Sequence, residues 1–229
     1  MLEELKEQVF EANIELVNQG LVTLTWGNVS GIDRERNLVV IKPSGVAYTE
    51  MESSQMVVVD FDGKLVEGDY QPSTDTPTHV RLYKHFPVIG GITHTHSSHA
   101  VMFAQARREI PCYGTTHADH FYGPVPLTRP LSEQEVTQSY EASTADAIIE
   151  RFADLDAAAL PAVLVAGHGP FAWGPTPAKS VENAVALEAV AQMAMGTMQI
   201  NVNSPDLESY VLEKHFKRKH GPAAYYGQK

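Results

Sequence analysis

Hydrophobic residues at the beginning of the chain recur at intervals of three and four positions, which is the period of an α-helix. Five residues form this repeat: Leu2, Leu5, Val9, Ala12 and Leu16. Their spacing places them on one face of an amphipathic helix, and Gly20 follows as a stop signal. The sequence therefore predicts that the chain opens with a helix packed against a core.

Other apolar runs are short and rich in β-branched residues, which predicts buried strands. Four segments have this character: 38–43 (LVVIKP), 56–61 (MVVVDF), 88–96 (VIGGITHTH) and 162–167 (AVLVAG). After the second segment, Asp62 and Gly63 lead into the run KLVEG, which indicates a hairpin.

Further helices are predicted in four segments: 77–86, 132–153, 178–199 and 206–219. The second of these begins at Ser132 with Glu135 three residues later, which is the spacing of a capping box. We see no internal repeat, low-complexity tract or linker. Residues 1–229 are therefore expected to form a single α/β domain with a largely antiparallel or mixed sheet, whose strand order the pattern does not give.

The formal net charge of −11 limits the partners of the chain. General affinity for nucleic acid or an anionic membrane requires a basic surface, so neither partner is expected, and a bound phosphate must be held by local groups. Cys112 is the only cysteine, which excludes an intrachain disulfide and cysteine-rich metal sites. No signal peptide and no run of roughly 18 apolar residues is evident, so we expect a cytoplasmic protein.

Three histidines stand where a metal ion would be held. His94 and His96 are two residues apart, and on a strand such side chains point to the same face. His168 follows another predicted strand, between two glycines that allow close approach of the backbone. Three imidazoles with one open position are typical of catalytic zinc. The alternative is that these histidines are hydrogen-bonded residues at strand ends, as His99 and His117 would be.

Three polar segments with small residues could bind phosphate: 27–30 (GNVS), 42–45 (KPSG) and 72–76 (PSTDT). Backbone N–H groups and hydroxyls in such segments bind anions, and Lys42 could add a positive charge. Each segment alone is more often an ordinary turn.

Seven motifs resemble those of the L-ribulose-5-phosphate 4-epimerases, a branch of the class II aldolase family. They are WGNVS (26–30), KPSGV (42–46), PSTDTPTH (72–79), HTHS (94–97), THADHFYG (116–123), GHGPFAWG (167–174) and AYYGQ (224–228). The resemblance covers essentially the whole chain. It implies an α/β/α sandwich with a central, mainly antiparallel sheet, assembled as a homotetramer with sites shared between adjacent subunits. The implied activity is that of an isomerase of L-arabinose catabolism, which interconverts L-ribulose 5-phosphate and D-xylulose 5-phosphate.

The resemblance also implies roles for individual residues. One zinc ion per subunit, or another divalent ion, is held by His94, His96 and His168. Six residues bind the sugar phosphate: Asn28, Lys42, Ser44, Gly45, Ser73 and Thr74. Thr116 and His215 also match positions that line the family's site.

Asp75 lies where the aldolases of this family have a glutamate that deprotonates the carbon next to the substrate carbonyl. The shorter side chain indicates the epimerase-like branch. Three roles remain open for Asp75 at this point, namely metal ligand, base, or N-cap of the helix that follows Pro77.

Inversion of C4 requires cleavage of a carbon–carbon bond, because the C4 hydrogen is not adjacent to the C2 carbonyl. Cleavage of C3–C4, rotation of the released aldehyde and re-formation of the bond would invert C4, with a metal stabilising the enediolate. Two acid/base groups on opposite faces must then move the proton of the C4 oxygen. The resemblance assigns these roles to Asp119, beside its own metal, and to Tyr226, which reaches the site of the adjacent subunit. Without the resemblance, Tyr226 is equally well interpreted as an aromatic clip for the tail.

Three other functions compete with epimerisation. The nearest is a class II aldolase that releases dihydroxyacetone phosphate, against which Asp75 argues. A non-catalytic binding module is the second, although such a protein would have no need to keep the three histidines. A zinc hydrolase is the third, and it would need a general base without the phosphate segments.

Overall fold

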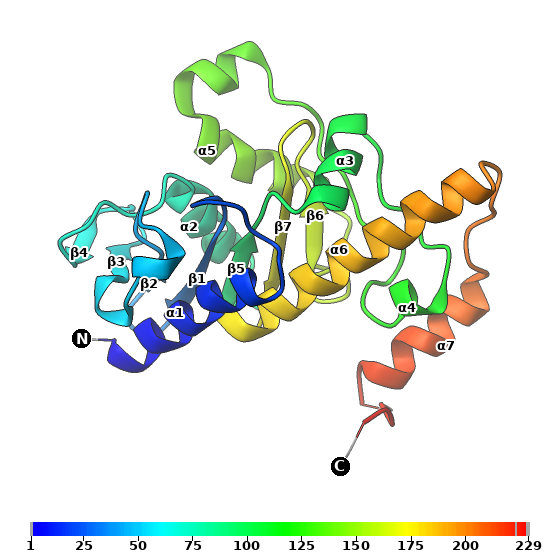
Figure 1. Ribbon diagram of the computed structural model, residues 1–229, viewed down its shortest axis with the longest axis horizontal. Coiled ribbons are helices and arrows are strands. Elements are labelled where there is room, and N and C mark those ends of the chain that lie inside the picture. The colour runs from blue at the N-terminus through cyan, green and yellow to red at the C-terminus, as the bar shows by residue number, and fades with distance from the viewer. Residues whose placement is uncertain (1, 223, 228–229) are drawn as a thin grey trace.

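The computed structural model describes residues 2–222 and 224–227 (Figure 1), so Gln228 of the last motif lies outside the described residues. Seven strands form one sheet in the order β4-β3-β2-β1-β5-β7-β6, and all neighbouring strands pair antiparallel. The strands are β1 (Asn28–Asp33), β2 (Leu38–Ile41), β3 (Val57–Asp60), β4 (Leu65–Glu67), β5 (Gly91–His94), β6 (Ala162–Leu164) and β7 (Pro170–Gly174).

Seven α-helices and two short 3-10 helices accompany the sheet in this part of the chain. The α-helices are α1 (Glu3–Asn18), α2 (Thr76–His85), α3 (Ser98–Ala106), α4 (Thr115–Ala118), α5 (Glu133–Arg151), α6 (Pro177–Ile200) and α7 (Ser209–Lys219). The 3-10 helices are η1 (Tyr48–Glu50) and η2 (Ser53–Gln55). Within the described ranges, none of the helices is both long and apolar enough to cross a membrane.

Helices cover both faces of the sheet. Alternate residues of a strand point to opposite faces. Val40 of β2 accordingly packs in a cluster with Val9 of α1, whereas Val39 belongs to the larger core cluster that contains Tyr83 of α2. In Figure 1, α1 and α6 cross in front of the strands, with α2 behind them. The expected α/β/α sandwich with an antiparallel sheet is confirmed.

The predicted helices and strands are all present, with shifted ends. The segment 88–96 is a strand only over Gly91–His94, and the last helix begins at Ser209 rather than at residue 206. The capping box is formed, since Ser132 and Glu135 each accept a hydrogen bond from the other's backbone N–H.

Two central strands, β1 and β7, were not expected from the sequence. The composition of segment 27–30 predicts a phosphate-binding segment or an ordinary turn, but residues Asn28–Asp33 form β1, which pairs with β2 and β5. Strand β7 likewise lies between β5 and β6. Both strands place candidate site residues at one end of the sheet, where Asn28 is paired with His94 and His94 with Phe171.

Candidate active site

The three candidate metal ligands come from the ends of adjacent strands. His94 is the last residue of β5, and His96 follows two positions later. His168 lies in the tight turn between β6 and β7, which is closed by a hydrogen bond of 2.9 Å from the N–H of Val165 to the carbonyl of Gly169. The antiparallel pairing of β5 with β7 therefore brings together residues more than 70 positions apart in the chain.

The imidazoles converge closely enough to bind one ion. One ring nitrogen from each of the three histidines lies within 4.8 Å of the other two. Nε2 of His94 is 3.1 Å from Nε2 of His96. Nδ1 of His94 donates to the carbonyl of Pro170 at 2.9 Å, so the ring proton is on Nδ1. The lone pair of Nε2 is therefore available to a metal ion in the cluster. Nδ1 of His168 is buried without a hydrogen-bond partner among the described residues.

Burial favours the neutral form of the His96 and His168 rings. Burial, with the nearby His94 and His96, lowers the pKa of His168 to about 4. Burial and His94 also lower the pKa of His96. Neutral imidazoles are the form that binds metal, and three of them with an open side fit a divalent cation such as zinc.

Gly169 permits this convergence because its α-carbon carries no side chain. A Cβ atom there would lie 2.9 Å from the carbonyl oxygen of Thr95, closer than such atoms normally approach. It would also lie 3.5 Å from Cδ2 of His96 and 3.6 Å from Cε1 of His94. The glycine therefore lets the turn that carries His168 pack directly against the other two ligands.

Asp75 lies beside the histidine cluster but is not one of its members. Its carboxylate accepts a hydrogen bond of 2.7 Å from the amide of Asn28. Burial raises the pKa of Asp75, but nearby His94 and the hydrogen bond from Asn28 help to hold it below its ordinary value. Asp75 occupies the N-cap position of α2, but its side chain makes no capping hydrogen bond to the helix, so the carboxylate is directed to Asn28 instead.

A cavity of about 420 Å³ opens over the histidines and Asp75. All six residues expected to bind phosphate line it: Asn28, Lys42, Ser44, Gly45, Ser73 and Thr74. Trp26, Tyr140 and Glu141, which the sequence had not singled out for a role, line it as well. The three separate polar segments and the histidines thus meet in one pocket.

Several backbone amides of the phosphate segments already form hydrogen bonds within the protein. The N–H of Val29 donates to the side chain of Asn13 at 2.9 Å, and the N–H of Ser44 donates to the carbonyl of Gln71 at 2.9 Å. The buried Lys42 ammonium donates to backbone carbonyls, including that of Val46 at 3.0 Å. Side-chain hydroxyls and Lys42 are groups of these segments that are suited to an anion.

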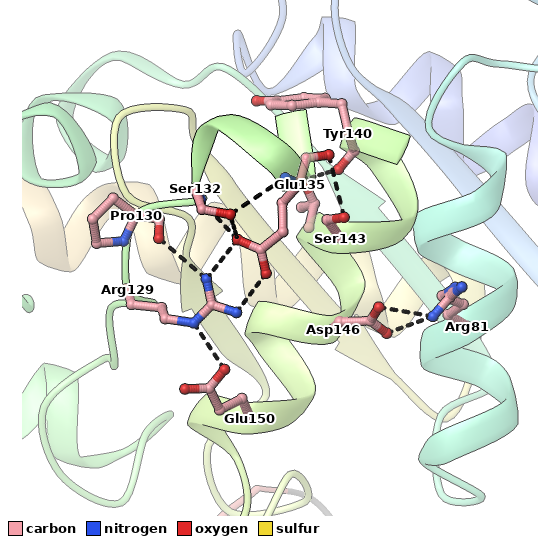
Figure 2. A network of polar contacts seen from close by, with 10 residues as sticks. Arg81, Arg129, Pro130, Ser132, Glu135, Tyr140, Ser143, Asp146 and Glu150 are labelled. Atoms are coloured by element: carbon pink, nitrogen blue, oxygen red, sulfur yellow. Dashed lines mark hydrogen bonds and ion pairs between the residues drawn. The ribbon is translucent and has the colours of Figure 1, made fainter. Parts of the chain in front are cut away.

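A break in α5 brings Tyr140 to the pocket. Ser139 is extended inside the helix (φ −167°), and the ring of the next residue, Tyr140, lies 5.8 Å from that of His168. Arg129 spans the break, because its guanidinium binds Glu135 at 2.7 Å before the break and Glu150 at 2.8 Å after it, as Figure 2 shows. Hydrogen bonds from Arg129 lower the pKa of Glu135 to about 2. Local propensity does not signal this break.

Asp119 and Tyr226 lie together, but not in the histidine pocket. Asp119 follows α4 and binds Arg218 and His215 of α7, and the Arg218 and Lys219 side chains lie over the ring of Tyr226. None of these residues is among those that line the pocket of His94. Asp119 was expected to lie beside the metal ion bound by the histidines of the same chain. The contacts of Asp119 with His215 and Arg218 of α7 hold it near Tyr226 instead.

Thr116 is also separate from the histidines. It lines a second cavity, of about 240 Å³, together with His117 and residues of α6. His117 itself is buried and donates to the carbonyl of Gly123 at 2.8 Å, and His99 binds the carboxylate of Glu188 at 2.7 Å. For these two histidines the interpretation as hydrogen-bonded residues holds.

Comparison with known proteins agrees with this geometry. Residues 7–195 match the family described as class II aldolase and adducin N-terminal domain, and the chain belongs to this family. The fold of this chain is that of the class II aldolase superfamily. Sugar-phosphate chemistry of aldolase and epimerase type is the chemistry of this superfamily.

Several solved structures share the fold. An L-fuculose 1-phosphate aldolase is 26% identical, with a TM-score of 0.76 over 93% of this chain and 94% of that one. The L-fuculose 1-phosphate aldolase from Glaciozyma antarctica PI12 is 18% identical, with a TM-score of 0.77 over 97% and 84%. An aldolase II superfamily protein from Pseudomonas syringae is 15% identical, with a TM-score of 0.78 over 96% and 87%. The last two likenesses concern the fold alone.

Proposed function

We propose that this protein is an L-ribulose-5-phosphate 4-epimerase that uses a divalent metal, most suitably zinc, and works in the cytoplasm in L-arabinose catabolism. The observation that carries the proposal is the joining of the three histidines, Asp75 and the phosphate segments in one cavity. A metal bound by the histidines would supply Lewis-acid stabilisation of negative charge on the substrate oxygens.

The pocket residues orient the substrate. Ser44, Ser73 and Thr74 offer hydroxyls and Lys42 offers a charge to the phosphate, in a chain whose overall charge would repel an anion. Asp75 supports epimerisation rather than lysis, because its short carboxylate is bound to Asn28 and cleavage of C3–C4 in a 4-epimerase requires proton transfer at oxygen only.

The acid and base of the reaction come, in this proposal, from an adjacent subunit of a homotetramer. Asp119 and Tyr226 lie near one another on α4 and the tail, apart from the histidines of their own chain. Tyr226 is 62% exposed and is thus accessible to a neighbouring molecule. In a closed ring every interface is the same head-to-tail contact, so each histidine pocket could receive this pair from its neighbour.

A second candidate is aldol cleavage of a 1-phosphate ketose to dihydroxyacetone phosphate. The 26% identity to an L-fuculose 1-phosphate aldolase favours it. A parallel assay of the zinc-loaded protein separates the two. Conversion of L-ribulose 5-phosphate to D-xylulose 5-phosphate, without comparable release of dihydroxyacetone phosphate from L-fuculose 1-phosphate, is the expected result. The reverse pattern would replace the epimerase with the aldolase.

A further inference from the structure

Tyr140 of α5 lies in the pocket of the histidines, and the function proposed above gives it no role. Its side chain lines the cavity together with Asp75 and His168, and its ring centroid is 5.8 Å from that of His168. Its backbone carbonyl accepts a hydrogen bond of 2.9 Å from the hydroxyl of Thr144. Its own hydroxyl has no hydrogen-bond partner among the described residues. The phenolic group can therefore contact a molecule that binds in the cavity.

The phenol of Tyr140 is a hydrogen-bond donor at neutral pH. Its partial burial, together with the nearby carboxylates of Asp75 and Glu141, raises its pKa above the ordinary value. The hydroxyl accordingly keeps its proton and cannot serve as a base. The oxygens of a sugar phosphate are hydrogen-bond acceptors, which is the chemistry that such a donor suits.

The two parts of α5, before and after the break at Ser139, are held in different ways. After the break, the hydroxyl of Thr78 in α2 donates to the carbonyl of Glu141 at 2.7 Å. Before it, residues 133–139 are exposed apart from the half-buried Glu135. The first part of the helix therefore has little core packing to fix its place. The buried residues of α5 all come after the break: Ala142, Thr144, Ala145, Ala147 and Ile148.

The guanidinium of Arg129 joins the two parts, as Figure 2 shows. Its Nη1 and Nη2 bind the two carboxylate oxygens of Glu135 at 2.9 and 2.7 Å, and its Nε binds Glu150 at 2.8 Å. An isolated exposed ion pair contributes little, but a bidentate pair within a network fixes geometry. Because Tyr140 is the first residue after the break, Arg129 fixes the relation of the two parts of α5 at the point where the tyrosine enters the pocket.

We propose that Tyr140 contacts the substrate, donating a hydrogen bond from its hydroxyl to an oxygen of the bound sugar phosphate, and that Arg129 is the positioning residue that holds it there. This inference rests on the proposed function, which supplies the sugar phosphate. It adds a polar group from the chain that carries the histidines to a site whose acid/base pair, in the proposed function, comes from a neighbouring subunit.

The contact is tested by fluorine nuclear magnetic resonance on the zinc-loaded, full-length protein labelled with 3-fluorotyrosine. Loss of one signal in Tyr140→Phe assigns the residue. L-ribulose 5-phosphate and L-fuculose 1-phosphate are added to separate samples, and we expect the Tyr140 signal to shift with the sugar phosphate that the protein binds. Sodium chloride at matched ionic strength is the control and should leave the signal in place. A signal that moves with neither sugar phosphate would overturn the contact.

Kinetics test the hydroxyl itself. Tyr140→Phe keeps the ring and removes the donor, so kcat/KM for L-ribulose 5-phosphate should fall on the order of tenfold. Zinc content should stay at the wild-type level, because Tyr140 is not one of the three clustered ligands. Arg129→Gln removes the ion pairs across the break. It should lower kcat/KM several-fold and shift the Tyr140 fluorine signal in the absence of sugar phosphate.

A double-mutant cycle tests whether Arg129 acts through Tyr140. In the Tyr140→Phe background, Arg129→Gln should have much less effect on kcat/KM than in the wild type. The matched control is Arg81→Gln, because Arg81 also binds a carboxylate of α5, that of Asp146 at 2.6 and 2.8 Å, but only after the break (Figure 2). This variant should keep the wild-type kcat/KM. Equal effects of Arg129→Gln in the two backgrounds would overturn the positioning role.

The outcomes separate this inference from the proposed function. If the wild type inverts C4 and Tyr140→Phe retains full kcat/KM, the hydrogen bond from Tyr140 is wrong while the epimerase stands. If the wild type does not invert C4 but L-fuculose 1-phosphate shifts the Tyr140 signal, the proposed function fails while the contact with a sugar phosphate stands.

Discussion

Arg218 holds the carboxylate of Asp119 through two hydrogen bonds, of 2.9 Å from Nε to Oδ1 and 2.5 Å from Nη2 to Oδ2. The same guanidinium lies 5.1 Å from the centre of the Tyr226 ring. Although burial raises the pKa of Asp119, these hydrogen bonds and that of His215 keep it below its ordinary value. The two candidate acid/base groups are therefore a pair on a single chain.

This pairing predicts which mutant subunits can complement each other. If one subunit supplies both groups to its neighbour's histidines, a mixture of Asp119→Asn and Tyr226→Phe subunits has no intact pair and should stay at the level of the parent variants. A mixture of His94→Ala and Asp119→Asn subunits should instead recover activity. After random exchange, about one half times one half, or roughly a quarter, of its sites combine intact histidines with an intact pair.

The complementation is measured as epimerase activity after exchange of differently tagged subunits, with mixed oligomers isolated through both tags. Recovery in the mixture of Asp119→Asn with Tyr226→Phe would show that the two groups serve different sites. Failure of the other mixture, despite demonstrated exchange, would show that the sites are not shared.

The three-histidine cluster predicts about one divalent ion per chain. His94→Ala, His96→Ala and His168→Ala each remove one of three ligands, so each variant should lose metal affinity by more than the roughly 10–100-fold typical of outer-shell changes. Elemental analysis of dialysed protein measures the content, with circular dichroism as a check on the fold. Full metal in all three variants would place the ion elsewhere.

Lys42 predicts a pH dependence of substrate binding. Burial lowers the pKa of its ammonium to about 8, so the positive charge is present below that pH and is lost above it. The substrate phosphate is a dianion across this range, because its second pKa is about 6. KM for the sugar phosphate should therefore rise as pH increases beyond about 8, whereas Lys42→Arg, which keeps its charge, should show a flat profile. The range from pH 7 to 9.5 extends about one unit or more to either side of that pKa. A wild-type KM that stays constant over this range would exclude Lys42 from phosphate binding.

Gly169 predicts a steric effect on the metal site. In Gly169→Ala, the new methyl group would meet the carbonyl of Thr95 and push the turn of His168 away, so metal affinity should fall on the order of tenfold or more. Gly196→Ala makes the same chemical change in α6, where nothing lies within 4 Å, and should leave metal affinity unchanged and stabilise the helix by about 0.5–1 kcal/mol. Competition with a chelator measures affinity, and equal values for the two variants would contradict the close packing.

Strands β1 and β7, which the sequence did not predict, show the limit of local sequence patterns. Segments 38–43 and 56–61 contain β-branched runs, so β2 and β3 were predictable. Strand β1 contains Asn28, Gly31 and Asp33, and β7 begins with Pro170, all residues that are depleted in strands. Each of these strands is paired on both sides, and this tertiary pairing outweighs the local preference.

The residues of the candidate site likewise fall into those that the sequence identifies and those whose place depends on tertiary structure. His94, His96 and the phosphate segments were identifiable because short spacings and motifs carry them. The roles of Tyr140 and Arg129 depend on a break at Ser139 within a segment that otherwise has a helical pattern. The place of Asp119 depends on Arg218, which lies 99 residues away in sequence, and no local pattern reports such a contact.

The central claim is that this protein inverts C4 of a ketopentose phosphate by cleaving and re-forming the C3–C4 bond. The most direct test is to incubate the zinc-loaded protein with L-ribulose 5-phosphate in deuterium oxide and to examine the products by nuclear magnetic resonance. The account predicts D-xylulose 5-phosphate that retains the original hydrogens on C3 and C4. Deuterium at C4 would contradict carbon–carbon cleavage, and failure to form D-xylulose 5-phosphate would contradict the epimerase itself.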